Sequence, residues 1–241
     1  MSEIVLFDID GTLLRGAGPQ HKNALIEGIR RVTGLETTLD GVATAGTLDR
    51  DLITLMLRTV GYSDDQICAV LPEAIIACQA AYLQNCASDL QPFVCTGARE
   101  FLEQLRECDA VLGLVTGNLS EIGWRKVELA RLRDYFSVGA FSEDGHTRAE
   151  LAGIAAERAR AYCQGTQYCP ITLIGDHAND IEAAKANRFR SIAVATGVSP
   201  VSELEKFLPD LVVHDLTELP VAKLMDRARV REIGEQLRPA T

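Results

Sequence analysis

Short apolar runs alternate with longer segments of helical spacing along most of the chain. The runs are rich in Val, Ile and Leu, as buried strands are. Six of them are expected strands, at Ile4–Phe7, Ala110–Val115, Ser137–Phe141, Ile171–Ile174, Ser191–Ala195 and Leu211–Val213. A strand that returns parallel to its neighbour needs a connection of helix length. The alternation therefore predicts an α/β fold: a doubly wound, Rossmann-like parallel sheet with helices on both faces.

One long interval between the first two expected strands breaks this alternation. It contains no run with strand character, and its helical patterns cover Gln20–Val32, Arg50–Val60 and Asp64–Cys86. Ser63, followed three residues later by Gln66, is a start signal for the third of these helices. A loop of this length in a compact protein is expected to carry its own packing. We therefore expect residues 15–91 to form an inserted all-helical domain, and residues 1–14 and 92–241 to form the α/β core domain.

Composition and charge narrow the class of protein. Of 241 residues, 47% are hydrophobic and 24% charged, and 24 basic against 34 acidic side chains give a net charge of −10. This is the composition of a soluble globular protein, and its negative charge disfavours nucleic acid and anionic membranes as partners. No segment approaches the roughly 18 apolar residues of a membrane span, and the seven cysteines contain no C-x-x-C pair. We expect a cytoplasmic protein, either a monomer or a homodimer.

Polar residues cluster directly after three of the expected strands. The first strand is followed by Asp8-Ile9-Asp10-Gly11-Thr12, the second by Thr116-Gly117-Asn118, and the fourth by Gly175-Asp176-His177-Ala178-Asn179-Asp180. Ligands of a doubly wound sheet bind outside the carboxyl ends of its strands, so four carboxylates are expected to meet there. Their mutual repulsion requires a cation, and an all-oxygen ligand set suits Mg²⁺ better than zinc. Helix caps and turns would explain these residues singly, but not two aspartates one residue apart at the end of a buried strand.

The segments at these strand ends match known motifs. Phe7-Asp8-Ile9-Asp10-Gly11-Thr12-Leu13 resembles the first motif of the haloacid dehalogenase-like hydrolase superfamily, in its phosphatase branch. Val115-Thr116-Gly117-Asn118 resembles the second motif, and Gly175-Asp176-x-x-x-Asp180 resembles the fourth. The helical insert resembles the mobile cap of phosphoglycolate-phosphatase-like members. The resemblance covers nearly the whole chain and implies an α/β core with a helical cap.

The third motif departs from the pattern of the superfamily. Members usually present a lysine, often followed by proline, at the start of the helix after the third strand. This chain reads Glu143-Asp144-Gly145-His146-Thr147-Arg148-Ala149 there. Arg148 is the nearest cationic match, and it keeps the positive charge but not the compact ammonium group. The alternative is that Arg148 is an ordinary exposed helix residue. Lys126, one helix earlier, is expected to be a surface residue.

The resemblance implies a role for each motif residue. Asp8 attacks phosphorus to form an aspartyl-phosphate, and Asp10 protonates the leaving oxygen and then deprotonates the attacking water. Gly11 and Thr12 shape the turn at the phosphate site. The groups that hold the nonbridging phosphate oxygens are Thr116, Gly117, Asn118 and Arg148. The groups at the Mg²⁺ ion are Asp8, the main-chain carbonyl of Asp10, Asp176 and Asp180, of which Asp180 orients Arg148 or a metal-bound water.

The expected cap contains candidate substrate residues. Gly46-Thr47-Leu48-Asp49-Arg50 resembles the G-x-T-D segment at the cap face nearest the active site, with Leu48 where threonine is common. Thr47, Asp49 and Arg50 are therefore candidate contacts. Basic side chains of the insert could meet a second anionic group of the substrate, although each alone is more typical of a solvated residue. They are Arg15, His21, Lys22, Arg50 and Arg58.

These motifs favour a Mg²⁺-dependent phosphatase that hydrolyses a small soluble phosphomonoester, which is phosphoglycolate-like or a sugar or nucleotide phosphate. Asp10 argues against dehalogenation, because the dehalogenase branch lacks an aspartate at that position. Two alternatives stay open. A phosphomutase of the same superfamily would form the same aspartyl-phosphate, but its Lys-Pro third motif is absent here. A non-catalytic binding or regulatory protein on the same fold would be supported only by Arg148.

Overall fold

A six-stranded parallel sheet forms the centre of the computed structural model, which describes residues 3–162 and 169–225. The order of its strands is β3-β2-β1-β4-β5-β6. Their bounds are β1 (Ile4–Phe7), β2 (Val111–Val115), β3 (Val138–Ala140), β4 (Ile171–Gly175), β5 (Arg190–Val194) and β6 (Leu211–Val213). The predicted α/β fold and its six strands are confirmed. Residues 226–241 of the expected core domain lie outside the described residues.

The central position of β1 brings the three polar strand ends together. β1 pairs in parallel with β2 on one side and with β4 on the other, and Phe7 is aligned with both Leu114 and Ile174. The strands therefore end at the same level, and the Asp8 amide donates a hydrogen bond to the Ile174 carbonyl. The residues that follow β1, β2 and β4 consequently share one edge of the sheet.

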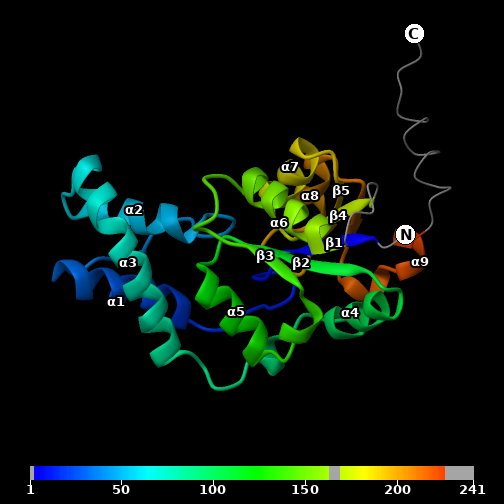
Figure 1. The fold of residues 1–241 in the computed structure, drawn as a ribbon, viewed down its shortest axis with the longest axis horizontal. Helices are drawn as coiled ribbons and strands as arrows, with labels where there is room; N and C mark the ends of the chain where they lie inside the picture. Colours follow the sequence, from blue (N-terminus) through cyan, green and yellow to red (C-terminus); the bar gives the residue numbers. More distant parts are fainter. Residues whose placement is uncertain (1–2, 163–168, 226–241) are drawn as a thin grey trace, which may run out of the picture.

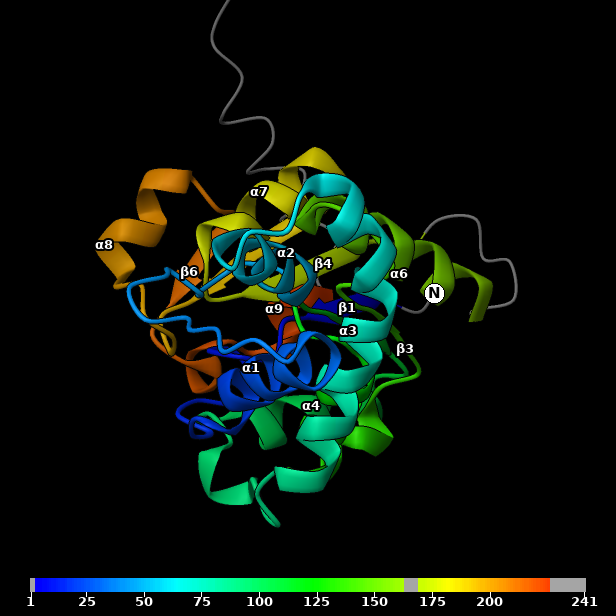
Figure 2. The ribbon, with the colours of Figure 1, turned by 90° about the vertical axis from the view of Figure 1, so that its left-hand side faces the viewer.

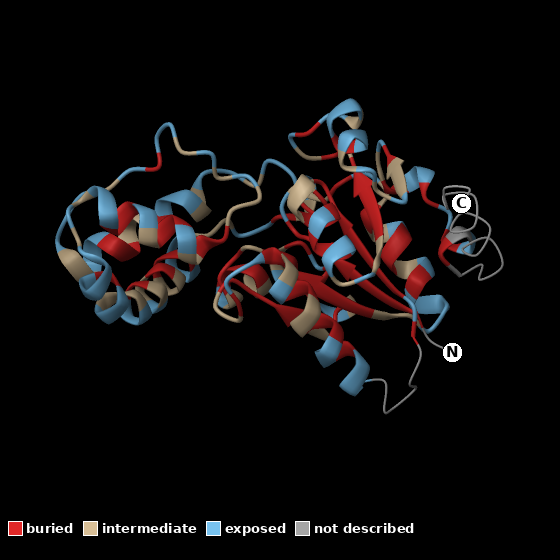
Figure 3. Ribbon diagram, turned by 90° about the horizontal axis from the view of Figure 1, so that it is seen from above, coloured by how far each residue is buried: buried red, intermediate tan, exposed pale blue. Residues whose placement is uncertain are grey.

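Helices cover both faces of the sheet (Figure 1). One face carries α4 (Ala98–Glu107), α5 (Ser120–Leu129) and α9 (Val221–Met225), and the other carries α6 (Arg148–Tyr162), α7 (Ala178–Ala186) and α8 (Val201–Leu204). Single turns of 3-10 helix connect these elements, at Gln91–Phe93, Arg133–Tyr135, Glu205–Phe207 and Leu216–Glu218. The strands are buried almost throughout, whereas the outer faces of the helices are exposed (Figure 3).

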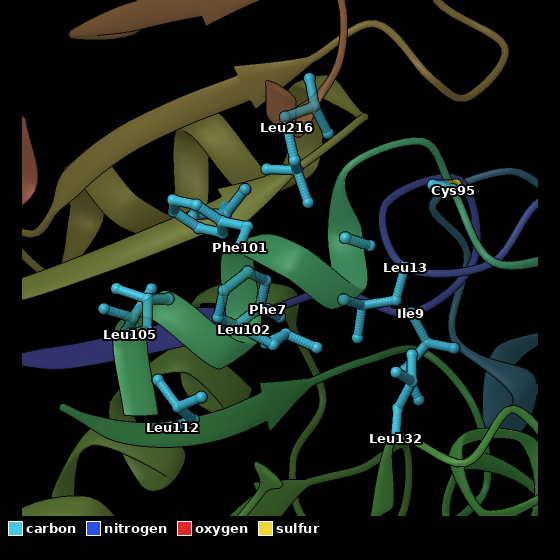
Figure 4. Packing of buried hydrophobic residues seen from close by; sticks show 14 of the residues in the cluster. Phe7, Ile9, Leu13, Cys95, Phe101, Leu102, Leu105, Leu112, Leu132 and Leu216 are labelled. Carbon is cyan, nitrogen blue, oxygen red and sulfur yellow. The ribbon is translucent and has the colours of Figure 1, made fainter. Parts of the chain in front are cut away.

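Alternate side chains of β1 pack into two separate hydrophobic clusters. Ile4 and Leu6 lie among the alanines of α6, and Val5 and Phe7 lie among the side chains of α4. The Phe7 ring meets the Phe101 ring edge to face, with the ring centroids 6.2 Å apart (Figure 4). Burial on both faces explains why this strand reads as a continuous apolar run in the sequence.

The helical insert packs as a unit of its own at the carboxyl edge of the sheet. It consists of α1 (Gln20–Thr33), α2 (Asp49–Thr59) and α3 (Asp64–Asn85), which lie together in front of the sheet in Figure 2. Its buried side chains form a cluster distinct from those of the sheet, which Leu119 and Ile122 of the core join. The predicted capping box of Ser63 and Gln66 at the start of α3 is present. This separate packing supports our proposal that residues 15–91 form a cap domain.

The expectation that no segment approaches a membrane span is wrong for α3. This helix of 22 residues is long and apolar enough to cross a membrane, by length and composition only. Within the described residues it is the single helix that passes this test, which is weak support for membrane insertion. The helix packs against α1 and α2, and it leaves Ile76 and Leu83 exposed.

Candidate active site

Three of the four carboxylates that the sequence predicts at the carboxyl edge of the sheet meet in one cluster. Asp8 follows β1, Asp176 follows β4, and Asp180 lies in the first turn of α7. All three are buried, and one carboxylate oxygen from each lies within 4.8 Å of the other two. An all-oxygen set of this kind is what hard divalent cations such as Mg²⁺ prefer. The chemistry of these donors therefore fits a divalent cation.

The turn after β1 leaves space for the Asp176 carboxylate. A Cβ added to Gly11 would lie 2.2 Å from Asp176 Oδ2, and one added to Gly197 would lie 1.6 Å from the same atom. Gly11 also has a φ of +97°, which favours glycine. Thr12 Oγ1 donates to Asp176 Oδ1 over 3.4 Å. Gly11 and Thr12 thus shape the surroundings of this carboxylate.

Burial makes this acidic cluster costly to ionise. Burial raises the pKa of Asp8 to about 7 against the opposing charge of Arg148. Burial also raises the pKa of Asp176 to about 8, and the neighbouring charge of Asp8 adds to that shift. A divalent cation would lower both pKa values, because it stabilises the charged form of each carboxylate that it touches.

Arg148 lies inside the acidic cluster and is not an exposed helix residue. It begins α6 and is only 9% exposed. Its Nη2 donates to Asp8 Oδ1 over 2.5 Å, and its Nε donates to Asp180 Oδ1 over 2.7 Å. The planar guanidinium therefore bridges two carboxylates, which a single ammonium group would do with different geometry. This contact supports the assignment of Arg148 to the position of the third-motif lysine.

The loop after β2 contributes a hydroxyl and an amide. Thr116 is fully buried, and its Oγ1 accepts from the main-chain N of Asn118 over 3.3 Å and from Asn118 Nδ2 over 2.5 Å. Asn118 Nδ2 also donates to Asp10 Oδ2 over 2.7 Å. The backbone of Gly117 touches the cap, because its carbonyl accepts from the Asp49 amide over 2.8 Å. The three predicted residues of this loop thus lie between the sheet edge and the cap.

Lys126 is the site residue that the sequence reasoning missed. It was expected on the surface, but it is 2% exposed. Its Nζ donates to both oxygens of Asp10 over 2.8 and 2.7 Å and to Asn118 Oδ1 over 2.7 Å. A signal was available, because Lys126 follows the buried Ile122 by one helical turn and so shares the apolar face of α5.

Asp10 differs from the other predicted acidic residues. Its side chain is 47% exposed and faces Lys126, so it is not part of the three-aspartate cluster. Burial by itself would raise the pKa of Asp10, but the charge of Lys126 and the hydrogen bonds from Lys126 and Asn118 together lower it below its ordinary value. Asp10 therefore lies beside the cluster, where Lys126 and Asn118 donate hydrogen bonds to it.

His21 and Asp49 of the cap contact the core beside Asp10, where His21 lies next to Lys126. His21 Nδ1 lies 3.0 Å from Lys126 Nζ, and His21 Nε2 lies 2.8 Å from Asp49 Oδ2. The same Asp49 oxygen accepts from the Leu119 amide of the core over 2.8 Å. His21, interpreted from the sequence as a solvated residue, is therefore engaged in the contact between cap and core.

A cavity of about 400 Å³ separates the cap from the sheet edge. Its lining includes Asp8 and Asp10 from the core, and Thr47 and Asp49 from the cap. Arg50 is not among the described residues that line it, and its amide instead donates to Ser142 Oγ over 2.8 Å. The cavity is of the size that small-molecule sites have.

A parallel α/β core that gathers aspartates, a threonine and a buried arginine at one edge, under a helical cap, defines the class of a haloacid dehalogenase-like protein. A model of the family described as haloacid dehalogenase-like hydrolase matches residues 3–187. The chain belongs to this family, which confirms the resemblance seen in its motifs.

Comparison with individual proteins gives one curated relative and several similar structures. The chain is 32% identical over 125 residues to a phosphoglycolate phosphatase from Chromobacterium violaceum. That match spans 51% of this chain and 53% of the relative, about half the length of each. A β-phosphoglucomutase structure from Clostridium difficile superimposes with a TM-score of 0.65 at 15% identity, covering 97% of this chain and 100% of the other. A predicted phosphatase from Clostridium acetobutylicum gives a TM-score of 0.65 at 19% identity, covering 94% and 100%. At these identities the two structures show the shared fold.

Proposed function

We propose that this chain is a Mg²⁺-dependent phosphatase that hydrolyses small phosphomonoesters through an aspartyl-phosphate. One observation carries the proposal: two aspartates from one strand end line the same cavity in different surroundings. Asp8 lies in the acidic cluster against Arg148, and Asp10 lies outside the cluster against Lys126. A nucleophile and a separate acid–base group are the two protein groups that this hydrolysis needs.

The side chains of the site would act in two displacements. In the first, an oxygen of Asp8 attacks phosphorus, the bond to the leaving oxygen breaks, and Asp10, which enters this step in its protonated form, gives that oxygen a proton. In the second, Asp10 takes a proton from water as the water oxygen attacks phosphorus, and the Asp8 carboxylate is released. Splitting the hydrolysis in this way lowers the barrier of each step.

The remaining polar groups would hold the phosphate during both displacements. Arg148 donates to Asp8, and Thr116 lines the same cavity together with Gly117 and Asn118 of its loop. A Mg²⁺ ion bound by Asp8, Asp176 and Asp180, together with the Asp10 carbonyl, would neutralise charge on the transferring phosphoryl group. Positioning and charge neutralisation are the main protein contributions to phosphoryl transfer.

The cavity indicates the class of substrate. A volume of about 400 Å³ suits a small molecule, and Arg15 and Lys22 of the insert are among its lining residues. These cations favour a substrate with a second anionic or strongly polar group, such as a phosphoglycolate-like ester or a sugar or nucleotide phosphate. We also propose that the enzyme is cytoplasmic and that its partner is such an ester. The net charge of −10 disfavours nucleic acid and anionic membranes as partners.

Phosphate release from a panel of small phosphomonoesters tests the proposal. We expect release with Mg²⁺, none with EDTA, and none from Asp8→Asn, which serves as the blank. A folded wild-type protein that releases no phosphate from any ester would contradict the phosphatase. Analysing the sugar phosphates for isomerisation in the same reactions would then reveal a phosphomutase.

A further inference from the structure

The ammonium group of Lys126 has no proton left for a substrate phosphate. An ammonium has three donor protons. Their acceptors are the Asp10 carboxylate, Asn118 Oδ1 and His21 Nδ1, at 2.7 to 3.0 Å. Lys126 therefore does not serve as the cation of a phosphate-binding site, and its influence on a reaction must pass through a residue that it binds.

Asp10 is the residue on which these contacts converge. Both of its oxygens accept from Lys126, and Oδ2 also accepts from Asn118 Nδ2 over 2.7 Å. Two donors on one carboxylate fix both the direction and the plane of the group. An aspartate with half of its side chain exposed would otherwise move among several rotamers, and reacting groups gain from being held in one geometry.

The cap fixes Lys126 in turn. Because Lys126 donates to His21 Nδ1, the proton of the His21 ring is assigned to Nε2, which donates to Asp49. Asp49 is anchored to the core by the Leu119 amide. A continuous series of hydrogen bonds thus runs from Asp49 through His21 and Lys126 to Asp10. Its first two members belong to the cap and its last two to the core.

We propose that Lys126 is a positioning residue that aims the Asp10 carboxyl group at the leaving oxygen, and that His21 and Asp49 of the cap hold Lys126 in place for this task. The inference rests on the proposed phosphatase activity. Asp10 alone exchanges a proton with the leaving oxygen and with water, while Lys126 keeps its three protons. Proton transfer to the leaving group then depends on the cap being seated on the core.

Esters with different leaving groups test the role of Lys126. A nitrophenolate leaves without a proton, whereas the alkoxide of an alkyl phosphate needs one. Since acid catalysis contributes about 10²- to 10⁴-fold, we expect Lys126→Met to lower kcat/KM for an alkyl phosphate by about 100-fold and for p-nitrophenyl phosphate by only about threefold. The ratio kcat/KM is the right measure because it covers the first displacement, in which the ester bond breaks. Lys206→Met, an exposed lysine of the core, is the matched control and should change neither value.

Chemical rescue separates positioning from folding. Lys126 lines the cavity, so a small amine can reach its place. Ethylammonium should restore part of the alkyl phosphate activity of Lys126→Ala and should leave the activity on p-nitrophenyl phosphate nearly unchanged. A residue that only stabilised the fold would show no such selective rescue. Circular dichroism and thermal unfolding of each variant check that it is folded.

Two variants of His21 test the role of the cap in holding Lys126. Asparagine at this position can still accept a hydrogen bond from Lys126, whereas phenylalanine cannot. We expect His21→Phe to lower the alkyl phosphate activity more than the aryl phosphate activity, and His21→Asn to keep most of both. Equal losses on the two esters in Lys126→Met and His21→Phe, with folded proteins, would overturn the inference. Wild-type protein that hydrolyses neither ester would instead overturn the proposed function.

Discussion

Asp8 and Asp10 lie two residues apart at the end of one strand, yet their surroundings shift their pKa values in opposite directions. Burial raises the pKa of Asp8 to about 7, among two other buried carboxylates. The pKa of Asp10 is lowered, because the charge of Lys126 and the hydrogen bonds from Lys126 and Asn118 together outweigh the effect of burial. Within one turn of the chain the structure thus has a buried acidic cluster and, beside it, a carboxylate with hydrogen-bond donors of its own. Neighbouring helices, not the strand itself, make this difference.

The two aspartates can be perturbed separately because different helices serve them. Arg148 at the start of α6 binds Asp8, and Lys126 in α5 binds Asp10. α6 and α5 lie on opposite faces of the sheet (Figure 1). A change at one aspartate should therefore leave the hydrogen bonds of the other intact.

The largest effect is expected from Asp8→Asn. An amide is a poor nucleophile, so kcat should fall by about 10⁴-fold or more, as when a covalent nucleophile is removed in other enzymes. The substitution also removes a buried charge, so the metal-free variant should unfold at the same temperature as the wild type or at a higher one. Steady-state kinetics and thermal unfolding measure the two effects. A variant with wild-type turnover would exclude the covalent route.

Arg148→Ala should have the next largest effect. It leaves Asp8 and Asp180 without their cation, and breaking a buried ion pair of this kind costs about 3–5 kcal/mol. Urea unfolding of the metal-free protein measures this loss. Arg158→Ala is the matched control, because Arg158 lies on the same helix in a partly exposed ion pair with Asp144, where about 0–1 kcal/mol is expected.

Arg148 should also matter for turnover. We expect kcat to fall by about 10²- to 10³-fold in Arg148→Ala, the usual cost of losing one group that stabilises a transition-state charge. Arg148→Lys should recover part of this loss, since it restores the charge but not the fork that spans two carboxylates. Unchanged kcat in Arg148→Ala would mean that another group supplies the positive charge of the third motif.

The raised pKa values of the acidic cluster predict how stability depends on pH and metal. Asp8 and Asp176 have folded pKa values of about 7 and about 8, above the ordinary value of 3.8. Their contribution to stability is therefore fully present below about pH 4 and is lost as the pH rises through 7 and 8. Between pH 5 and pH 8 the midpoint of thermal unfolding of the metal-free wild type should fall by more than that of metal-free Asp8→Asn.

Mg²⁺ should reverse this loss. A cation stabilises the ionised carboxylates, so its addition should raise the unfolding midpoint more at pH 8 than at pH 5. Calorimetry with and without EDTA measures both effects. An equal effect of Mg²⁺ at the two pH values would argue against a metal site formed by these carboxylates.

The acidic cluster could be predicted from the sequence because it depends on sheet geometry. Parallel strands that pair in register must end together, so residues after β1, β4 and β2 share one edge wherever the helices lie. Asp8, Asp176 and Thr116 follow from this rule alone. Arg148 required the resemblance as well, since its position in the first turn of a helix allows either a buried or an exposed side chain.

The burial of Lys126 had a local signal in the apolar face of α5, but its partners and the cap contacts could not be predicted in the same way. Which side of α5 faces the cap depends on where an inserted domain sits, and no local pattern encodes that placement. The expected contact by Arg50 shows the same limit. Successive helical residues point about 100° apart, and it is the Asp49 side chain that meets the Leu119 amide of the core. The strands and helices could be predicted from local patterns. The docking of the cap onto the core could not, because it depends on residues far apart in the sequence.

The smallest effect we predict is at the contact between cap and core. A Cβ added to Gly117 would lie 2.7 Å from the backbone oxygen of Thr47, so Gly117→Ala should push the cap away from the loop after β2. We expect KM to rise by about three- to tenfold, an overpacking cost of about 1 kcal/mol, with little change in the unfolding temperature. Gly153→Ala is the control, because Gly153 lies in α6 and its added Cβ would meet only Asn187 Oδ1, at 3.1 Å. If Gly117→Ala leaves KM unchanged while Asp8→Asn abolishes turnover, the seating of the cap is not part of substrate binding, and the chemistry belongs to the core alone.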